Sequence, residues 1–118
     1  MKRAEYLEKI QGTEINTEVV TKIETLYGYP LPLCIQKMVS YSETSIFFDD
    51  GYRTLSVAEI LEAEHDLHVD FISQHMIPVI DCGENDFVVY LFCDKVWSKF
   101  NIVDECFFKR RTSMRDLM

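Results

Sequence analysis

The first third of the chain carries apolar residues at the spacing of amphipathic helices. Tyr6, Leu7 and Ile10 form a short apolar stripe that ends at Gly12. A longer stripe follows the i, i+1, i+4, i+7, i+8 pattern, which places its members on one face of a helix. These members are Val19, Val20, Ile23, Leu26 and Tyr27. The pattern therefore predicts two helices, separated near Gly12.

Glycine and proline mark where these helices end and where the next one begins. Gly28 follows the second stripe and can end its helix in the left-handed conformation. Pro30 and Pro32 force extended backbone, and Pro32 can occupy the first position of a new helix. The buried face of that third helix is expected to consist of Ile35, Met38 and Val39.

The pattern changes after residue 44. Short apolar segments at 45–48 and 52–55 flank the turn sequence at 49–51, so this region predicts a β-hairpin. Ser56 and Glu59 have the spacing of a capping box, in which each side chain bonds to the other residue's backbone N–H. The helix that follows has an apolar stripe made of Val57, Ile60, Leu61 and Leu67.

The last third alternates short apolar segments with turns. Pro78 cannot donate a ladder hydrogen bond, so its strand is expected at an edge or with a bulge. Phe87 to Cys93 is apolar on both alternating faces, which is typical of a central strand. In the next strand the alternation directs Phe100 to the core and Trp97 outward. The predicted strands cover 76–81, 87–93, 96–102 and 104–109, and a short capped helix is expected after Ser113.

Strands joined by turns this short must pair antiparallel. Helices first and strands later are typical of the α+β class. We therefore expect one domain over residues 1–118, with a mostly antiparallel sheet of about five to six strands and helices packed around it.

Composition narrows the class of protein. The chain has 118 residues, enough for one core, with 47% hydrophobic and 27% charged residues. Its longest apolar run, Phe87 to Cys93, is far shorter than the roughly 20 residues that span a bilayer. The first eight residues lack the apolar stretch of a signal peptide. We expect a cytoplasmic protein, not bound to membrane, whose four scattered cysteines are reduced and mostly buried.

Charge is unevenly distributed within the net charge of −8. Residues 43–94 carry twelve acidic side chains and one base, Arg53, which gives a local net charge of −11. Such a segment attracts cationic partners. It argues against nucleic acid as a partner, because phosphate binding needs a basic surface. The sequence therefore predicts a basic protein partner.

Three of these acids share one side of the predicted helix after Ser56. At 100° per residue, Glu59, Glu62 and Asp66 lie opposite the apolar stripe. Asp70 joins them if the helix runs that far. Like charges at i, i+4 cost about 0.2–0.5 kcal/mol, which favours a partner-binding face. The alternative is a solvated acidic face with no partner.

Other side chains could extend this surface. Tyr52 and Trp97 are interpreted either as aromatic residues at the core edge or as interface anchors. The loop acids that could flank the acidic helix are Asp49, Asp50, Glu84 and Asp86.

Metal and catalytic chemistry are not expected. His65, Asp66, His68 and Asp70 have spacings that could hold an ion on a helix. However, both histidines project nearer the apolar side, so we interpret them as core-edge residues and predict no metal and no cofactor. Glycine-rich phosphate loops and the G-x-S-x-G, H-E-x-x-H and C-x-x-C motifs are absent. The predicted role is non-enzymatic.

The order of these signals resembles the SUKH superfamily, which contains a fungal cell-wall-synthesis regulator and many bacterial immunity proteins. The resemblance runs from about Thr17 to Leu117 and rests on "G-x-x-LP" at Gly28 to Pro32 and "LS-x-x-EI" at Leu55 to Ile60. The chain departs from the family at Ser42-Glu43-Thr44, where members often carry a glycine-bearing turn. The resemblance implies an α+β fold with a twisted sheet and a non-enzymatic role.

Bacterial members of that family bind and neutralise toxins, often nucleases. A nuclease must be basic to hold nucleic acid, and an acidic inhibitor can cover that surface. The first hypothesis is therefore an immunity protein for a basic toxin domain. The second is a regulatory scaffold for an endogenous protein, and the third a metal-assisted hydrolase.

Overall fold

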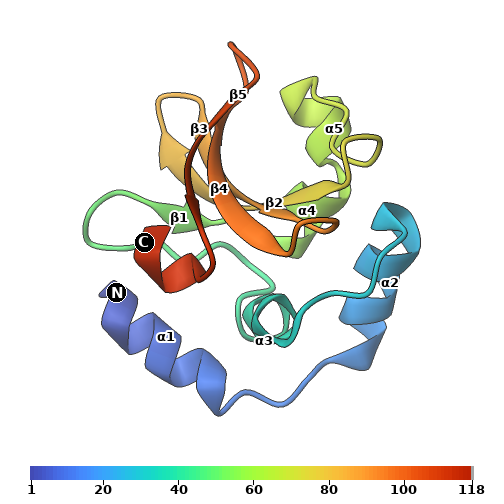
Figure 1. Ribbon diagram of the computed structural model, residues 1–118. Helices are drawn as coiled ribbons and strands as arrows, with labels where there is room; N and C mark the ends of the chain where they lie inside the picture. The colour runs from blue at the N-terminus through green and yellow to red at the C-terminus, as the bar shows by residue number, and fades with distance from the viewer. Residues whose placement is uncertain (118) are drawn as a thin grey trace.

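The computed structural model describes residues 1–117 and arranges them around a curved antiparallel sheet (Figure 1). Helices α1, α2 and α3 lie together along one side of the sheet, and α4 and α5 lie beside β2 (Figure 1). The predicted α+β class is confirmed. The elements are α1 (Arg3–Gln11), α2 (Thr17–Tyr27), α3 (Leu33–Tyr41), β1 (Arg53–Thr54), α4 (Val57–Leu61), α5 (Ala63–Leu67), β2 (Met76–Gly83), β3 (Asp86–Leu91), β4 (Val96–Asn101), β5 (Cys106–Arg111) and the 3₁₀ helix η1 (Met114–Leu117).

Helix ends follow the local rules read from the sequence. Gly28 ends α2 in the left-handed conformation, with φ of 81°. Pro32 is the residue before α3, so this helix begins one residue later than predicted. The ψ of Pro32, 153°, is that of extended backbone. The capping box of Ser56 and Glu59 is complete. Among residues 1–117, no helix has the length and apolar character to cross a membrane.

The predicted hairpin at 45–55 is present in a reduced form. Segment 45–48 forms no strand and contributes one isolated bridge, Phe47 to Arg53. Beside this bridge the Phe48 N–H donates to the Tyr52 carbonyl at 2.8 Å and the Thr54 N–H to the Ile46 carbonyl at 3.0 Å. The Ile46 N–H donates to the Thr54 side chain, at 2.9 Å from Oγ1. The turn at 49–51 is present, with Gly51 at φ of 93°. β1 is therefore only two residues long.

The strands follow one another in the sheet in chain order, β1-β2-β3-β4-β5. β3 is the central strand, as its apolar run predicted. The β2–β3 register slips between Pro78 and Ile80, which confirms the expected irregularity at Pro78. β1 pairs with β2 only at Asp81 and Ile80, so Pro78 lies where β2 has no second ladder. β5 begins two residues later than predicted, because the chain turns at 102–105.

Both faces of β4 are covered, which corrects one prediction. Trp97 and Lys99 are 5% and 8% exposed instead of pointing into solvent. Phe100, on the opposite face, packs edge-on against Phe71 in the segment after α5. Alternation separated the two faces correctly. It could not show that α1, α3 and η1 cover the face that carries Trp97.

Candidate protein-binding surface

Glu59 is engaged inside the molecule. Arg53 donates from Nη1 to Glu59 Oε1 at 2.8 Å and from Nη2 to Oε2 at 2.9 Å. Ser45 Oγ and the Ser56 N–H also donate to Oε1, at 2.9 and 3.0 Å. Arg53 Nη2 further donates to Asp81 at 3.2 Å. These bonds join β1, α4 and β2, so Glu59 belongs to a structural network instead of a free acidic stripe.

The network changes the acidity of Glu59. The bidentate hydrogen bonds from Arg53 lower its pKa to about 2, although partial burial acts in the opposite direction. The backbone N–H of Ser56 and the hydroxyl of Ser45 lower the pKa further. Glu59 therefore stays ionised in the folded protein over the whole physiological range.

Glu62 and Asp66 form an exposed acidic pair. The predicted helix breaks at Glu62, whose φ and ψ of −103° and 10° separate α4 from α5. The Asp66 N–H nevertheless donates to the Glu62 carbonyl at 2.9 Å, so the two residues remain one helical turn apart. Both side chains are exposed, and neither has an ion pair within residues 1–117.

Asp70 lies outside the helix, because α5 ends at Leu67 and His68 adopts the left-handed conformation. Its side chain is exposed, as are those of His65 and His68. The prediction that the two histidines lie at the core edge is wrong, since the break at Glu62 and the early end of α5 turn them outward. In residues 1–117, no three His, Cys, Asp or Glu side chains are grouped as metal ligands would be.

The acids of the turn at 49–51 contact the N-terminal segment. Asp50 forms an ion pair with Arg3, and Asp49 Oδ1 lies 3.1 Å from the Met1 amine. Tyr52 packs between two cations, with Arg3 4.5 Å and Lys99 5.0 Å from its ring centre. The Lys99 amine also donates to the Tyr52 hydroxyl at 2.7 Å. This loop is thus tied to α1 and β4.

Glu84 and Asp86 lie at the β2–β3 turn. Glu84 and Asn85 take φ values of 53° and 68°, as a type I′ turn requires. Glu84 is exposed, whereas Asp86 is half-buried and accepts a hydrogen bond from Asn101 Nδ2 at 2.9 Å. Figure 1 places this turn and α5 apart, towards opposite ends of β2. The turn acids therefore do not flank the acidic helix.

The remaining predicted residues also have places in the fold. Trp97 lies inside, where it lines a cavity that the sequence did not indicate. The four cysteines are free, but Cys93 and Cys106 are exposed instead of buried. The predicted acidic surface thus separates into dispersed parts, of which the Glu62–Asp66 pair is the one with both carboxylates exposed one helical turn apart.

Comparison with known proteins adds no relative. No family model matches the chain, and no curated protein or solved structure matches it either.

Proposed function

We propose that this chain is a non-enzymatic immunity protein that binds and neutralises a basic toxin domain, with the Glu62–Asp66 pair at the centre of the contact. The observation that carries the proposal is the exposure of both carboxylates on one helical turn, without a cation from the described residues. A net charge of −8 adds long-range attraction to a basic surface.

The repulsion between the carboxylates of Glu62 and Asp66 supports a binding role for this pair. Two like charges at i, i+4 on a helix repel by about 0.2–0.5 kcal/mol, and the hydrogen bond from the Asp66 N–H to the Glu62 carbonyl keeps this spacing although Glu62 itself lies in the break between α4 and α5. Glu59, by contrast, contributes to folding through Arg53. A basic partner that supplies cations to Glu62 and Asp66 relieves their repulsion and associates quickly by electrostatic steering.

Co-expression tests the proposal. The probe is the protein encoded by the neighbouring reading frame, expressed in a bacterial host with and without this chain. We expect this chain to rescue growth, and Glu62→Lys/Asp66→Lys to abolish rescue. The matched control is Glu14→Lys/Glu18→Lys, which makes the same charge change on exposed residues before and within α2.

The outcomes separate the proposals. Rescue that is lost in Glu62→Lys/Asp66→Lys and kept in Glu14→Lys/Glu18→Lys supports the contact at Glu62 and Asp66. Equal rescue by both double variants places the contact elsewhere. If the neighbouring protein is not toxic but still binds this chain, a regulatory scaffold for an endogenous partner replaces the immunity role.

A further inference from the structure

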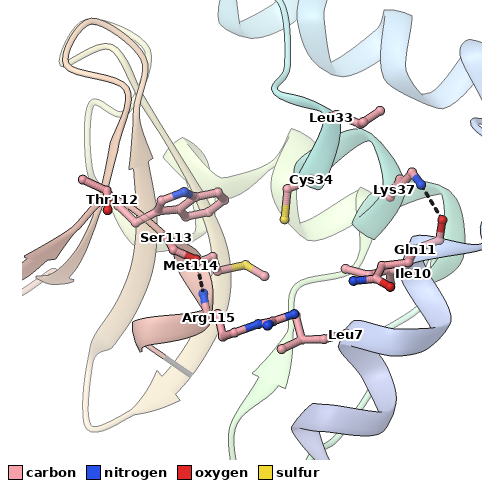
Figure 2. A pocket seen from close by; sticks show the side chains of 11 residues that line it. Leu7, Ile10, Gln11, Leu33, Cys34, Lys37, Thr112, Ser113, Met114 and Arg115 are labelled. Carbon is pink, nitrogen blue, oxygen red and sulfur yellow. Dashed lines mark hydrogen bonds between the residues drawn. The ribbon is translucent and has the colours of Figure 1, made fainter.

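A cavity of about 510 Å³ opens between the helical layer and the C-terminal end of the chain. Side chains from α1, α3, β4 and η1 converge on it in Figure 2. Its volume lies within the roughly 300–1,000 Å³ range of small-molecule sites. The lining residues are Leu7, Ile10, Gln11, Leu33, Cys34, Lys37, Trp97, Thr112, Ser113, Met114 and Arg115.

The cavity has an apolar interior. Ile10 and Met114 are buried parts of the core, and Trp97, which is 5% exposed, also lines the cavity. Leu33, the first residue of α3, also lines the cavity, and its side chain is 61% exposed. Leu33 and Trp97 both line the cavity and provide apolar surface on which a ligand can bury its own apolar body.

Charge at the cavity has the opposite sign to that of the whole protein. Two cationic residues, Lys37 and Arg115, line it, and no Asp or Glu does so within the described residues. The Lys37 amine donates to the Gln11 carbonyl at the end of α1, which fixes it beside the opening. Figure 2 shows the Arg115 side chain reaching from η1 towards Leu7 on α1.

The Cys34 thiol adds no charge to the cavity. Burial raises its pKa above the ordinary value, so the sulfur stays neutral beside the apolar residues. Thr112 and Ser113 add hydroxyl groups, and Gln11 adds an amide. The cavity therefore offers apolar contacts inside and hydrogen-bond donors with positive charge around them.

We propose that this cavity binds a small amphipathic carboxylate, with the ligand's apolar body against Trp97 and Leu33 and its carboxylate at the cavity rim, where Lys37 and Arg115 supply positive charge from different sides. A monocarboxylate fits better than a polyphosphate because most of the lining is apolar. A small molecule fits better than a folded partner because the site is a cavity of limited volume. It is built mainly from α1, α3, β4 and η1, so it is separate from Glu62 and Asp66.

Trp97 provides the readout, because it is the only tryptophan in the chain. Purified full-length protein is titrated with decanoate, and the indole fluorescence is recorded. Decan-1-ol and decylamine, which share the alkyl chain but differ in head group, are titrated in parallel. We expect a saturable change with decanoate, weaker binding of the alcohol and the weakest binding of the amine.

Two variants test the assigned contacts. Lys37→Gln/Arg115→Gln is expected to weaken decanoate binding about tenfold and to leave decan-1-ol unchanged. Leu33→Asp, at an exposed position where folding is little affected, is expected to weaken decanoate more than decan-1-ol. Lys22→Gln/Lys109→Gln removes the same two charges at exposed positions on α2 and β5 outside the cavity; it is the matched control for the double variant and is expected to bind like the unchanged protein.

Protection of Cys34 gives an independent measurement. Decanoate is expected to slow alkylation of Cys34, read by mass spectrometry, while exposed Cys93 and Cys106 react at unchanged rates. The proposal is overturned if decanoate gives no saturable signal. It is also overturned if the three head groups bind equally, or if the double variant binds decanoate as the control does.

Discussion

Arg53 and Glu59 form a bidentate ion pair, with N–O distances of 2.8 and 2.9 Å. The pair links the first residue of the two-residue strand β1 to the first turn of α4. It converts a residue that the sequence placed on an acidic binding face into one that holds the fold together. The consequence is a separation between acids that stabilise the chain and acids that are free to bind a partner.

The first prediction follows from this separation. Glu59→Gln keeps the capping box, since glutamine can fill the same position, but removes the charge that pairs with Arg53. We expect a loss of about 1 kcal/mol in unfolding free energy, modest because Glu59 is 37% exposed and solvent screens the pair. Urea unfolding measures it. Protection against the partner should not change. A large loss of protection in a fully folded Glu59→Gln variant would indicate that Glu59 contacts the partner.

The pH dependence of stability gives the second prediction. The pKa of Glu59 is about 2 in the folded protein, below its ordinary value of 4.5. Its contribution is therefore fully present above pH 4.5 and is lost as the pH falls from there towards 2. The difference in unfolding free energy between the unchanged protein and Glu59→Gln should shrink over this window. A difference that stays constant from about pH 6 to pH 3 would contradict the ionic role of Glu59.

The buried position of Trp97 leads to the third prediction. Trp97→Ala should destabilise the protein by about 3 kcal/mol, the lower end for aromatic truncation, because the side chain already borders a cavity. Thermal or urea unfolding measures this loss. An exposed interface anchor would show almost no effect, so a change below about 0.5 kcal/mol would contradict the observed packing.

The β2–β3 turn provides the fourth prediction. Asn85 takes a φ of 68°, a conformation that glycine adopts without strain and that the second turn position of a type I′ hairpin favours. Asn85→Gly should therefore raise the unfolding free energy by about 0.5 kcal/mol. Asn85→Val is the opposing variant, because a β-branched residue resists positive φ, and it should be less stable. Equal stability of the two variants would contradict the turn geometry.

Local signals predicted the fold where neighbouring residues decide it. Gly28 ends α2, Ser56 and Glu59 form the capping box, and the strand register slips near Pro78. Each of these outcomes depends on residues within a few positions of one another, so their sequence spacing is sufficient. The antiparallel order of β2 to β5 followed equally from the short turns between them.

Contacts between distant residues could not be read in this way. Alternation placed Trp97 and Phe100 on opposite faces, but it carries no information about which face the N-terminal helices cover. Charge counting grouped Asp50 with Glu62, although the fold joins Asp50 to Arg3 and leaves Glu62 exposed. The predicted surface was too large because acids close in sequence were assumed to be close in space.

The central claim is that Glu62 and Asp66 together contact a basic partner. Its most direct test is the association rate between this chain and the protein encoded by the neighbouring reading frame, measured at several salt concentrations. Glu62→Lys/Asp66→Lys is compared with Glu14→Lys/Glu18→Lys, since both change the net charge equally. We predict that the association rate falls steeply with salt. We also predict that Glu62→Lys/Asp66→Lys associates at least tenfold more slowly than Glu14→Lys/Glu18→Lys. Equal rates for the two variants, or a rate that does not depend on salt, would contradict the claim.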